Sequence, residues 1–298
     1  MKVLITGATG WLGHAALQAI KKVLVDVKSE DLNLYASHER LHSDPTFGLV
    51  QINDFASSEH KPKNIDLFIA LALKTRDYSI KMDEEDYLAG NKDLIEKHIE
   101  LMKATNPKKI ILISSGVVSK YLEGSWPLDP YTEIKLLEEK LFNEFAKQAG
   151  SKLIIMRLWG ATGELMTEPL KYAIGNLIYQ AETTNQIVIK SKREVFRRYT
   201  DATQIFQVLI RGLQNNFSGT LNSGGATVEI ESLAQLIVNN YQKSIEIVRK
   251  LETGSKPDLY FPIDSEFDSL AKSVGVNLLS LEDQIALTTK SVKHAIEN

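Results

Sequence analysis

The sequence of 298 residues contains no cysteine. This absence excludes disulfide bonds, a catalytic thiolate and thiolate metal sites, and it fits a reducing compartment such as the cytoplasm. An excess of charge of one sign is also lacking, because 35 basic and 38 acidic residues leave a net charge of −3. No basic field therefore favours nucleic acid or an anionic membrane as a partner.

Long hydrophobic runs and metal-ligand patterns are missing too. The longest apolar run, at 67–73, is too short to span a bilayer, and no signal-peptide pattern opens the sequence. Of six histidines, His38 and His42 are four apart, but no third ligand of suitable spacing accompanies them. We therefore expect a soluble cytoplasmic protein that acts on a small molecule, with no metal, nucleic-acid or membrane partner.

Strand-like and helix-like segments alternate through the first 158 residues. Buried-strand patterns occur at 2–6, 32–37, 47–52, 65–73, 108–115 and 152–158, and helical periodicity at 12–26, 84–105 and 130–149. This order predicts an α/β fold, a Rossmann-like doubly wound parallel sheet with a smaller C-terminal substrate-binding domain. We expect the dinucleotide-binding domain over 1–165, with 195–225 returning to it, and the smaller domain over 166–194 and 226–298.

The first predicted strand runs into three evenly spaced glycines, Gly7, Gly10 and Gly13. A strand, a glycine turn and a helix N-terminus together form a phosphate site, because unpaired amides and the positive end of the helix dipole face the anion. Gly7 permits the tight turn, Gly10 lets the pyrophosphate approach the backbone, and Gly13 lets the helix lie against the strand. The turn predicts a bound dinucleotide.

The stretch TGATGWLG resembles the extended branch of the short-chain dehydrogenase/reductase superfamily, the NAD-dependent epimerase/dehydratase family. The resemblance implies that Asp54 meets the adenine, that residues 71–73 lie beside the ribose, and that Asn91 bonds inside the fold near the active site. The predicted cofactor-binding residues are Gly7, Thr9, Gly10, Trp11, Leu12, Gly13, Ser37, Arg40, Asp54, Phe55, Leu71, Ala72, Leu73, Asn91, Tyr131 and Lys135.

The end of the second predicted strand bears on the choice between NAD and NADP. An acid there would bind the ribose 2′-hydroxyl of NAD. Ser37 stands at about this position, with Glu39 and Arg40 just beyond. Serine and a nearby arginine suit a 2′-phosphate, whereas Glu39 would suit NAD. We expect NAD(P) and favour NADP.

The stretch DPYTEIK places Tyr131 and Lys135 four residues apart on a predicted helix, so that they share a face. Of the ten tyrosines, Tyr131 alone has a lysine four residues later. An ammonium beside a phenol favours the phenolate, which lets the tyrosine exchange a proton with a substrate oxygen near neutral pH. Ser115 matches the catalytic serine of the family. We therefore predict Ser115, Tyr131 and Lys135 as catalytic residues.

The substrate is less clearly indicated. Nucleotide-sugar enzymes of this branch bind the diphosphate with an asparagine after the sixth strand, an Asn-Leu pair that opens a later helix, and an arginine. Here Asn176, Leu177 and Arg198 match the last two elements, whereas Gly160 stands at the first and has no amide side chain. A nucleotide sugar and a small carbonyl or hydroxyl compound both stay open, and Asn176 could instead cap a helix.

Two further expectations complete the interpretation. The leading function is an NAD(P)-dependent oxidoreductase, epimerase or dehydratase that moves hydride between nicotinamide and a carbonyl or hydroxyl carbon. The alternative is a non-catalytic NAD(P)-binding sensor, because some relatives keep the glycine turn and lose catalysis. The resemblance also implies that the helices near 83–105 and 131–149 could pair across a homodimer.

Overall fold

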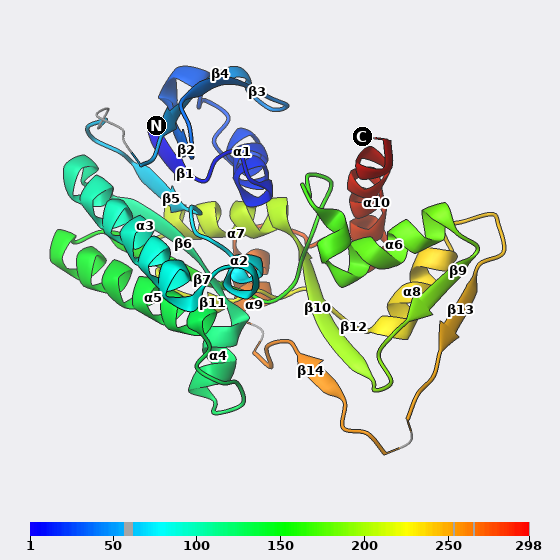
Figure 1. The fold of residues 1–298 in the computed structure, drawn as a ribbon. Helices are drawn as coiled ribbons and strands as arrows, with labels where there is room; N and C mark the ends of the chain where they lie inside the picture. Colours follow the sequence, from blue (N-terminus) through cyan, green and yellow to red (C-terminus); the bar gives the residue numbers. More distant parts are fainter. Residues whose placement is uncertain (57–61, 253, 265, 298) are drawn as a thin grey trace. The chain divides into compact units, whose positions relative to one another are not determined.

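The computed structural model describes residues 1–56, 62–252, 254–264 and 266–297. Within them an eight-stranded sheet has the order β11-β7-β6-β5-β1-β2-β4-β3 (Figure 1). Its strands are β1 (Val3–Thr6), β2 (Leu32–Ala36), β3 (Arg40–Asp44), β4 (Gly48–Asp54), β5 (Leu67–Ala70), β6 (Lys109–Ser115), β7 (Lys152–Leu158) and β11 (Gly219–Asn222). All neighbours are parallel except β3, which runs antiparallel to β4 at one edge. The predicted Rossmann-like parallel sheet is confirmed.

Helices cover both faces of this sheet. In Figure 1, α3 and α5 lie side by side on one face, and α1 lies on the other. Leu101 of α3 and Phe142 of α5 join Leu4 and Phe68 of the strands in one buried apolar cluster. The helices of this region are α1 (Trp11–Val23), the 3-10 turn η1 (Ser29–Asp31), α2 (Arg76–Lys81), α3 (Glu84–Thr105), α4 (Gly116–Leu122) and α5 (Pro130–Ala149), with α7 (Ala202–Gln214) before β11.

Helix α5 shows how local sequence fixes a functional position. Asp129 caps its N-terminus and accepts a hydrogen bond from the Thr132 amide, and Pro130 occupies the first helical position. Gly150 ends the helix in the left-handed conformation, with φ of 69°. The helix therefore begins immediately before Tyr131, and the residues at 131 and 135 project from its first two turns.

The chain divides into two compact units, a larger one of residues 1–158 and 206–222 and a smaller one of residues 159–205 and 223–298. The expected domain limits differ from this division, chiefly at 195–205. Strand β10 (Val195–Asp201) pairs with β8 (Ala161–Thr162), β12 (Ala226–Glu229) and β14 (Asp258–Tyr260), all in the smaller unit. These ladders, which the sequence did not indicate, join 195–201 to strands of the smaller unit.

The smaller unit packs three helices against short strands. Its core includes Ile178, Leu233 and Ile285, one from each of α6, α8 and α10. Its other elements are the 3-10 turn η2 (Pro169–Lys171), α6 (Ala173–Thr183), β9 (Gln186–Ile189), α8 (Ile230–Val238), β13 (Glu246–Arg249), α9 (Glu266–Ser273) and α10 (Leu281–Glu297).

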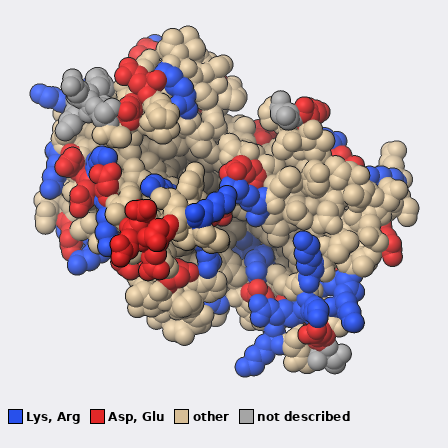
Figure 2. Space-filling view, in the orientation of Figure 1, with Lys and Arg blue, Asp and Glu red and all other residues tan. Residues whose placement is uncertain are grey.

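Charged side chains are unevenly spread over each unit. In Figure 2, acidic side chains gather where α3 begins, and its first turn contains Glu84, Glu85 and Asp86, which suits the positive end of the helix dipole. Basic side chains gather over the end of the smaller unit that carries β13 and β14. Among the described residues, no helix combines the length and the apolar character needed to cross a membrane.

Candidate active site

The glycine turn after β1 requires glycine at two of its three positions. Gly7 has φ of 70°, and a Cβ there would lie 3.0 Å from the amide nitrogen of Ala72. A Cβ on Gly13 would lie 2.4 Å from the carbonyl oxygen of Ala8, closer than real side chains approach a backbone. The turn is therefore tight, and α1 lies directly against the end of β1.

The N-terminus of α1 is suited to an anion. Gly10 is the N-cap residue, and no side chain caps the helix. The first turn contains no acidic residue. A helix of 13 residues thus presents uncapped amides and the positive end of its dipole beside the glycine turn. These features fit the pyrophosphate of a dinucleotide, and the cofactor roles of Thr9, Trp11 and Leu12 stay predictions.

A buried histidine supports this turn from behind. Thr6 accepts hydrogen bonds at Oγ1 from the amides of Leu71 and Ala72, at 3.1 and 3.4 Å. Its own hydroxyl proton is left for Nε2 of His98, which lies 2.7 Å away. Burial lowers the pKa of His98 to about 3, so the imidazole is neutral. Sequence reasoning missed His98, although its position follows the helical period of the buried residues Tyr87, Asn91 and Ile95 on α3, and that spacing could have indicated a buried histidine.

The segment that follows β5 is also held by a side chain of α3, Asn91. The strand predicted over 65–73 ends at Ala70, and the next residues, including Leu73, are half-buried. Asn91 is fully buried, accepts a hydrogen bond from the amide of Lys74 at 2.9 Å and donates to its carbonyl oxygen at 3.4 Å. Asn91 thus pairs with the backbone of this segment as a strand would.

The residues predicted to meet the adenosine half lie at the ends of β2 and β4. Asp54 is the last residue of β4 and accepts a hydrogen bond from the Ala56 amide, and Phe55 is buried against His98. Ser37 and Arg40 are exposed just beyond β2. The Oε1 atom of Glu39 accepts a hydrogen bond from Gln51, which directs this acid towards β4.

Ser115 and Tyr131 come from neighbouring elements of the larger unit. Ser115 is the last residue of β6 and also caps α4, where its hydroxyl accepts a hydrogen bond from the Val117 amide at 3.5 Å. Tyr131 is half-buried in the first turn of α5, a helix that packs against β6. The structure thus places both hydroxyls at helix starts.

Lys135 is buried and held at two points. Its Nζ donates hydrogen bonds to the carbonyl oxygen of Ile113 and to Oε2 of Glu138, both at 2.8 Å. Burial opposes the ammonium charge, but the attraction of Glu138 and of Tyr131 outweighs it and raises the pKa of Lys135 above its usual value. The lysine therefore carries a stable positive charge, with one ammonium proton beyond the two already donated.

A second buried ion pair, which sequence reasoning missed, joins α5 to β6 and β7. Glu139 accepts two hydrogen bonds from Arg157 of β7, at 3.0 and 2.8 Å, and one from Ser114 of β6 at 2.6 Å. Ser119 accepts a further bond from Arg157 and donates to Asn222 of β11. The spacing of Lys135, Glu138 and Glu139 along α5 could have indicated two buried acids.

The residues expected to bind a substrate diphosphate are largely engaged within the smaller unit. Asn176 is exposed and accepts a hydrogen bond from Gln180. It does not cap α6, because Tyr172 is the N-cap residue. Leu177 is buried in the core, with 5% of its surface exposed. The structure therefore leaves their role in binding a prediction.

Arg198 and Gly160 are also held by contacts within the smaller unit. The Arg198 guanidinium donates to the carbonyl oxygens of Gly225 and Asp264 and forms an ion pair of 2.6 Å with Asp268. A Cβ on Gly160 would lie 2.4 Å from the carbonyl oxygen of Arg198. Gly160 therefore lacks a side chain because the backbone of β10 occupies that space.

An open cavity of about 520 Å³ lies wholly within the smaller unit. Its lining includes Glu194, Glu229 and Glu231 together with Arg249. None of the predicted site residues lines it. Its acidic lining does not suit a phosphate, so we assign the chemistry to the strand ends of the larger unit instead.

Comparison with known proteins agrees with this arrangement. The model of a family described as the NAD dependent epimerase/dehydratase family matches residues 3–224. A search of curated proteins found no match.

Three similar solved structures illustrate the fold. An NAD-dependent NDP-hexosamine 5,6-dehydratase, TunA, of tunicamycin biosynthesis is 18% identical, with a TM-score of 0.76 over 98% of both chains. A UDP-glucuronic acid 4-epimerase from Bacillus cereus, in complex with UDP-glucuronic acid and NAD, is 19% identical, with a TM-score of 0.72 over 99% of this chain and 100% of the other. A UDP-N-acetylglucosamine 4-epimerase from Methanobrevibacter ruminantium is 20% identical, with a TM-score of 0.72 over 99% of this chain and 98% of the other. At such identities these structures show a shared fold.

Proposed function

This chain belongs to the NAD dependent epimerase/dehydratase family and is therefore an enzyme that uses a nicotinamide dinucleotide, and from that premise we propose that it acts on a nucleotide sugar. It would move hydride between the nicotinamide and a carbonyl or hydroxyl carbon of the sugar. The observation that carries the catalytic part is that Tyr131 and Lys135 share one face of α5, with Ser115 at the end of β6 against which α5 packs. The solved structures support the substrate class, since several are described as complexes with UDP sugars.

The catalytic residues act on one substrate oxygen. The bound dinucleotide would supply a hydride acceptor and donor. Tyr131 would exchange a proton with the reacting hydroxyl or carbonyl oxygen, while Ser115 donates a hydrogen bond to the same atom. Lys135 keeps its positive charge near Tyr131, because Glu138 and the carbonyl oxygen of Ile113 hold its ammonium in place. The proposal therefore assigns Lys135 the role of the positive charge beside the phenol.

The test of catalysis is the Tyr131→Phe variant. We expect turnover of a sugar nucleotide to fall by about 10² to 10⁴, the contribution of a positioned general acid. The dissociation constant of the dinucleotide, measured by calorimetry, should stay within about twofold, because the glycine turn is unchanged. Products of a panel of UDP sugars are to be separated by chromatography, since epimers have equal mass.

The matched control is Tyr78→Phe, because Tyr78 is 51% exposed on α2 and lies outside the predicted site. It should keep full turnover. Full turnover in Tyr131→Phe would contradict the catalytic proposal. Conversion of small carbonyl compounds, but of no sugar nucleotide, would contradict the substrate class alone. The non-catalytic sensor has no support in the family or the similar structures.

For the cofactor, the residues beyond β2 favour NADP. Ser37 and Arg40 are exposed where the adenosine ribose is expected. The carboxylate of Glu39 accepts a hydrogen bond from Gln51. The Bacillus cereus epimerase described above is a complex with NAD, so a preference for NADP would distinguish this chain from it.

The test compares two neighbouring variants. We expect Arg40→Ala to weaken NADP binding by roughly tenfold, because a charge-assisted bond to the 2′-phosphate contributes more than 1 kcal/mol, and to leave NAD binding unchanged. Glu39→Ala serves as the control and should not weaken NADP binding. Tighter binding of NAD than of NADP by the unaltered chain would contradict the preference. The cytoplasmic location and the homodimer expected from the sequence stay predictions.

A further inference from the structure

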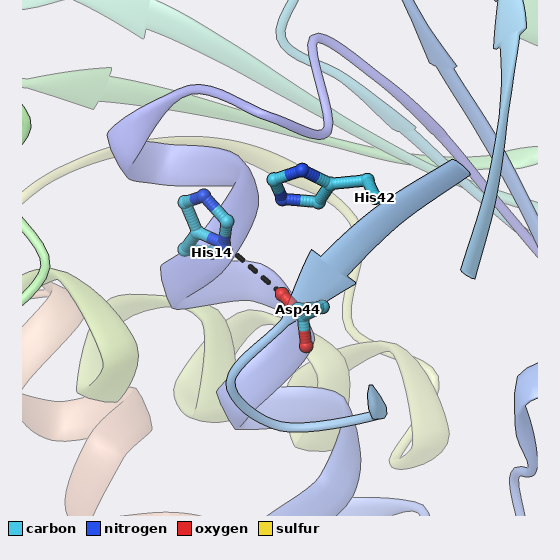
Figure 3. A group of neighbouring side chains, drawn as sticks. All are labelled: His14, His42 and Asp44. Atoms are coloured by element: carbon cyan, nitrogen blue, oxygen red, sulfur yellow. Dashed lines mark hydrogen bonds and ion pairs between the residues drawn. The ribbon is translucent and has the colours of Figure 1, made fainter. Parts of the chain in front are cut away.

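A polar cluster lies between α1 and the edge strand β3, apart from the residues assigned above. Alternate residues of β3 face opposite sides, so Leu41 and Ser43 are exposed while His42 and Asp44 point inward. His14 of α1 faces them (Figure 3). Inward positions of a strand under a helix are ordinarily apolar. Three polar side chains in this place need a reason beyond packing.

The three side chains bring potential ligand atoms close together. One atom from each of His14, His42 and Asp44 lies within 4.8 Å of the other two. Nδ1 of His14 is 3.0 Å from Oδ2 of Asp44, and the two imidazole ring centres are 5.6 Å apart. Figure 3 shows the two rings beside one another, with the carboxylate next to both.

Hydrogen bonding explains Asp44 but not His42. The other carboxylate oxygen of Asp44 accepts hydrogen bonds from the amides of Thr46 and Phe47, at 2.8 and 2.9 Å, which fixes the carboxylate and turns Oδ2 towards His14. In the described part of the chain, Nε2 of His42 is buried and has no hydrogen-bond partner. A buried polar atom without a partner costs free energy, which a bound ligand would recover.

We propose that His14, His42 and Asp44 form a binding site for one divalent transition-metal ion, with zinc as the ion that fits best. The proposal revises the expectation of no metal, which rested on His38 and His42 alone. The fold brings His42 instead to two ligands far away in the sequence, His14 and Asp44.

The ligand set and its dimensions favour zinc. Two imidazoles and one carboxylate are ligands that zinc commonly takes, whereas calcium and magnesium prefer sites built from oxygen alone. Ligand atoms about 2.0–2.1 Å from a tetrahedral zinc lie about 3.3 Å from one another. The distance between the His14 and Asp44 ligand atoms is already close to this spacing. The most distant pair of ligand atoms would have to approach by at most about 1.5 Å. A fourth position would be open to water.

A bound ion would fasten the edge of the sheet. Among the residues that the structure describes, β3 pairs with β4 alone, and its place between β2 and β4 in the chain is where doubly wound folds usually have a helix. A metal held by α1 and β3 would tie this strand to the helix that begins at the glycine turn. We therefore expect zinc to stabilise the larger unit without taking part in hydride transfer.

The test is zinc binding by the full chain after removal of metals with a chelator. Calorimetry with zinc chloride should show one site per chain, and thermal unfolding should shift to higher temperature with zinc. Cobalt should give the visible absorption of a tetrahedral site with nitrogen and oxygen ligands. His42→Ala should weaken zinc binding by at least about 100-fold, since even loss of a residue behind a metal ligand can cost that much.

The matched control is His38→Ala, because His38 is exposed four residues before His42 and should leave zinc affinity within twofold. His42→Gln provides a milder replacement should the alanine variant fold poorly, and its unfolding temperature in chelator checks the fold. Two results would overturn the proposal. One is a calorimetric titration in which the unaltered chain does not bind one zinc ion per chain. The other is a folded His42 variant that binds zinc as tightly as the unaltered chain.

Discussion

Several predicted site residues of the larger unit are accessible, whereas two of those in the smaller unit are held in its interior. In the larger unit, the predicted residues lie at strand ends and helix starts, where Gly10 and Ser37 are exposed and Tyr131 is half-buried. In the smaller unit, Leu177 is buried in the core and the guanidinium of Arg198 is bonded to its own neighbours. The contrast is not complete, because Asn91 and Lys135 of the larger unit are buried and bonded to their neighbours, and Asn176 of the smaller unit is exposed.

The comparison shows where a match of residue types is informative. At the end of β1 the backbone conformation itself demands glycine, so the residue type and the geometry have one cause. An arginine at position 198 could serve either to bind a phosphate or to form an ion pair within the protein. The ion pair with Asp268 accounts for the arginine without a phosphate. The three predictions below test this contrast.

The largest effect is expected at the glycine turn. Gly13→Ala should lower the free energy of unfolding by roughly 3–5 kcal/mol, because its Cβ would meet the backbone of Ala8 at 2.4 Å. Gly10→Ala is the matched change, since a Cβ there lies at an ordinary contact distance of 3.5 Å from Gly7. It should cost no more than about 1 kcal/mol of stability.

Cofactor affinity separates the two glycines. If the pyrophosphate approaches the backbone at Gly10, Gly10→Ala should weaken dinucleotide binding about tenfold or more while the protein stays folded. Calorimetry at a temperature below both unfolding transitions measures this. Unchanged affinity in Gly10→Ala would show that the anion does not rest on this turn, and the contrast between the units would lose its main support.

A smaller effect is expected from Arg198→Ala in the smaller unit. Removing the guanidinium takes the donor from Oδ2 of Asp268 and from three backbone carbonyl oxygens, which should cost about 2–4 kcal/mol in denaturant unfolding. Arg193→Ala is the control, because Arg193 is exposed and its ion pair with Asp258 should contribute no more than about 1 kcal/mol. If Arg198→Ala instead raised the KM for a sugar nucleotide and left stability intact, the smaller unit would also present free binding residues.

The third effect depends on pH and belongs to the larger unit. The pKa of His98 falls from about 6.5 in the unfolded chain to about 3 in the folded protein. Between these two pH values the unfolded state binds a proton at His98 and the folded state does not. The stability from this group is complete above pH 6.5 and is lost progressively as the pH falls towards 3. Between pH 7 and pH 5 the unaltered chain should lose about 2 kcal/mol through His98.

His98→Gln should remove this part of the pH dependence, because glutamine does not titrate. Its stability at pH 7 is expected to be lower, since the hydrogen bond to Thr6 changes. The readout is the slope of the unfolding free energy against pH, with exposed His38→Gln as the control that should keep the original slope. An unchanged slope in His98→Gln would place the titration elsewhere.

Much of the larger unit could be predicted from the sequence. Its central strands are continuous apolar runs and its long helices have clear periods, so α5 was predicted at its observed bounds of 130–149. The edge strand β3 could not be predicted, because its inward positions, His42 and Asp44, are polar and so it lacks the apolar pattern of the other strands. Its antiparallel pairing depends on a turn and a partner strand rather than on its own composition.

The partners of the site residues were harder to predict than the residues themselves. Ser115, Tyr131 and Lys135 stand in a recognisable order along the chain. The contacts of Lys135 with Glu138 and of Arg157 with Glu139 depend on which face of α5 is buried, and charged residues are ordinarily expected on the exposed face. In the smaller unit, β10 carries two consecutive arginines whose acidic partners, Asp258 and Asp268, lie more than 60 residues away. No local pattern indicates contacts of that range.

Gly160 limits how the enzyme's specificity can be redesigned. The family resemblance implies an asparagine at this point in nucleotide-sugar enzymes, and introducing that asparagine would be the obvious way to change the substrate preference. Here the carbonyl oxygen of Arg198 occupies the space of the first side-chain carbon. An asparagine at position 160 would therefore displace β10. A redesign would have to move this strand first, or place the hydrogen-bond donor at another position.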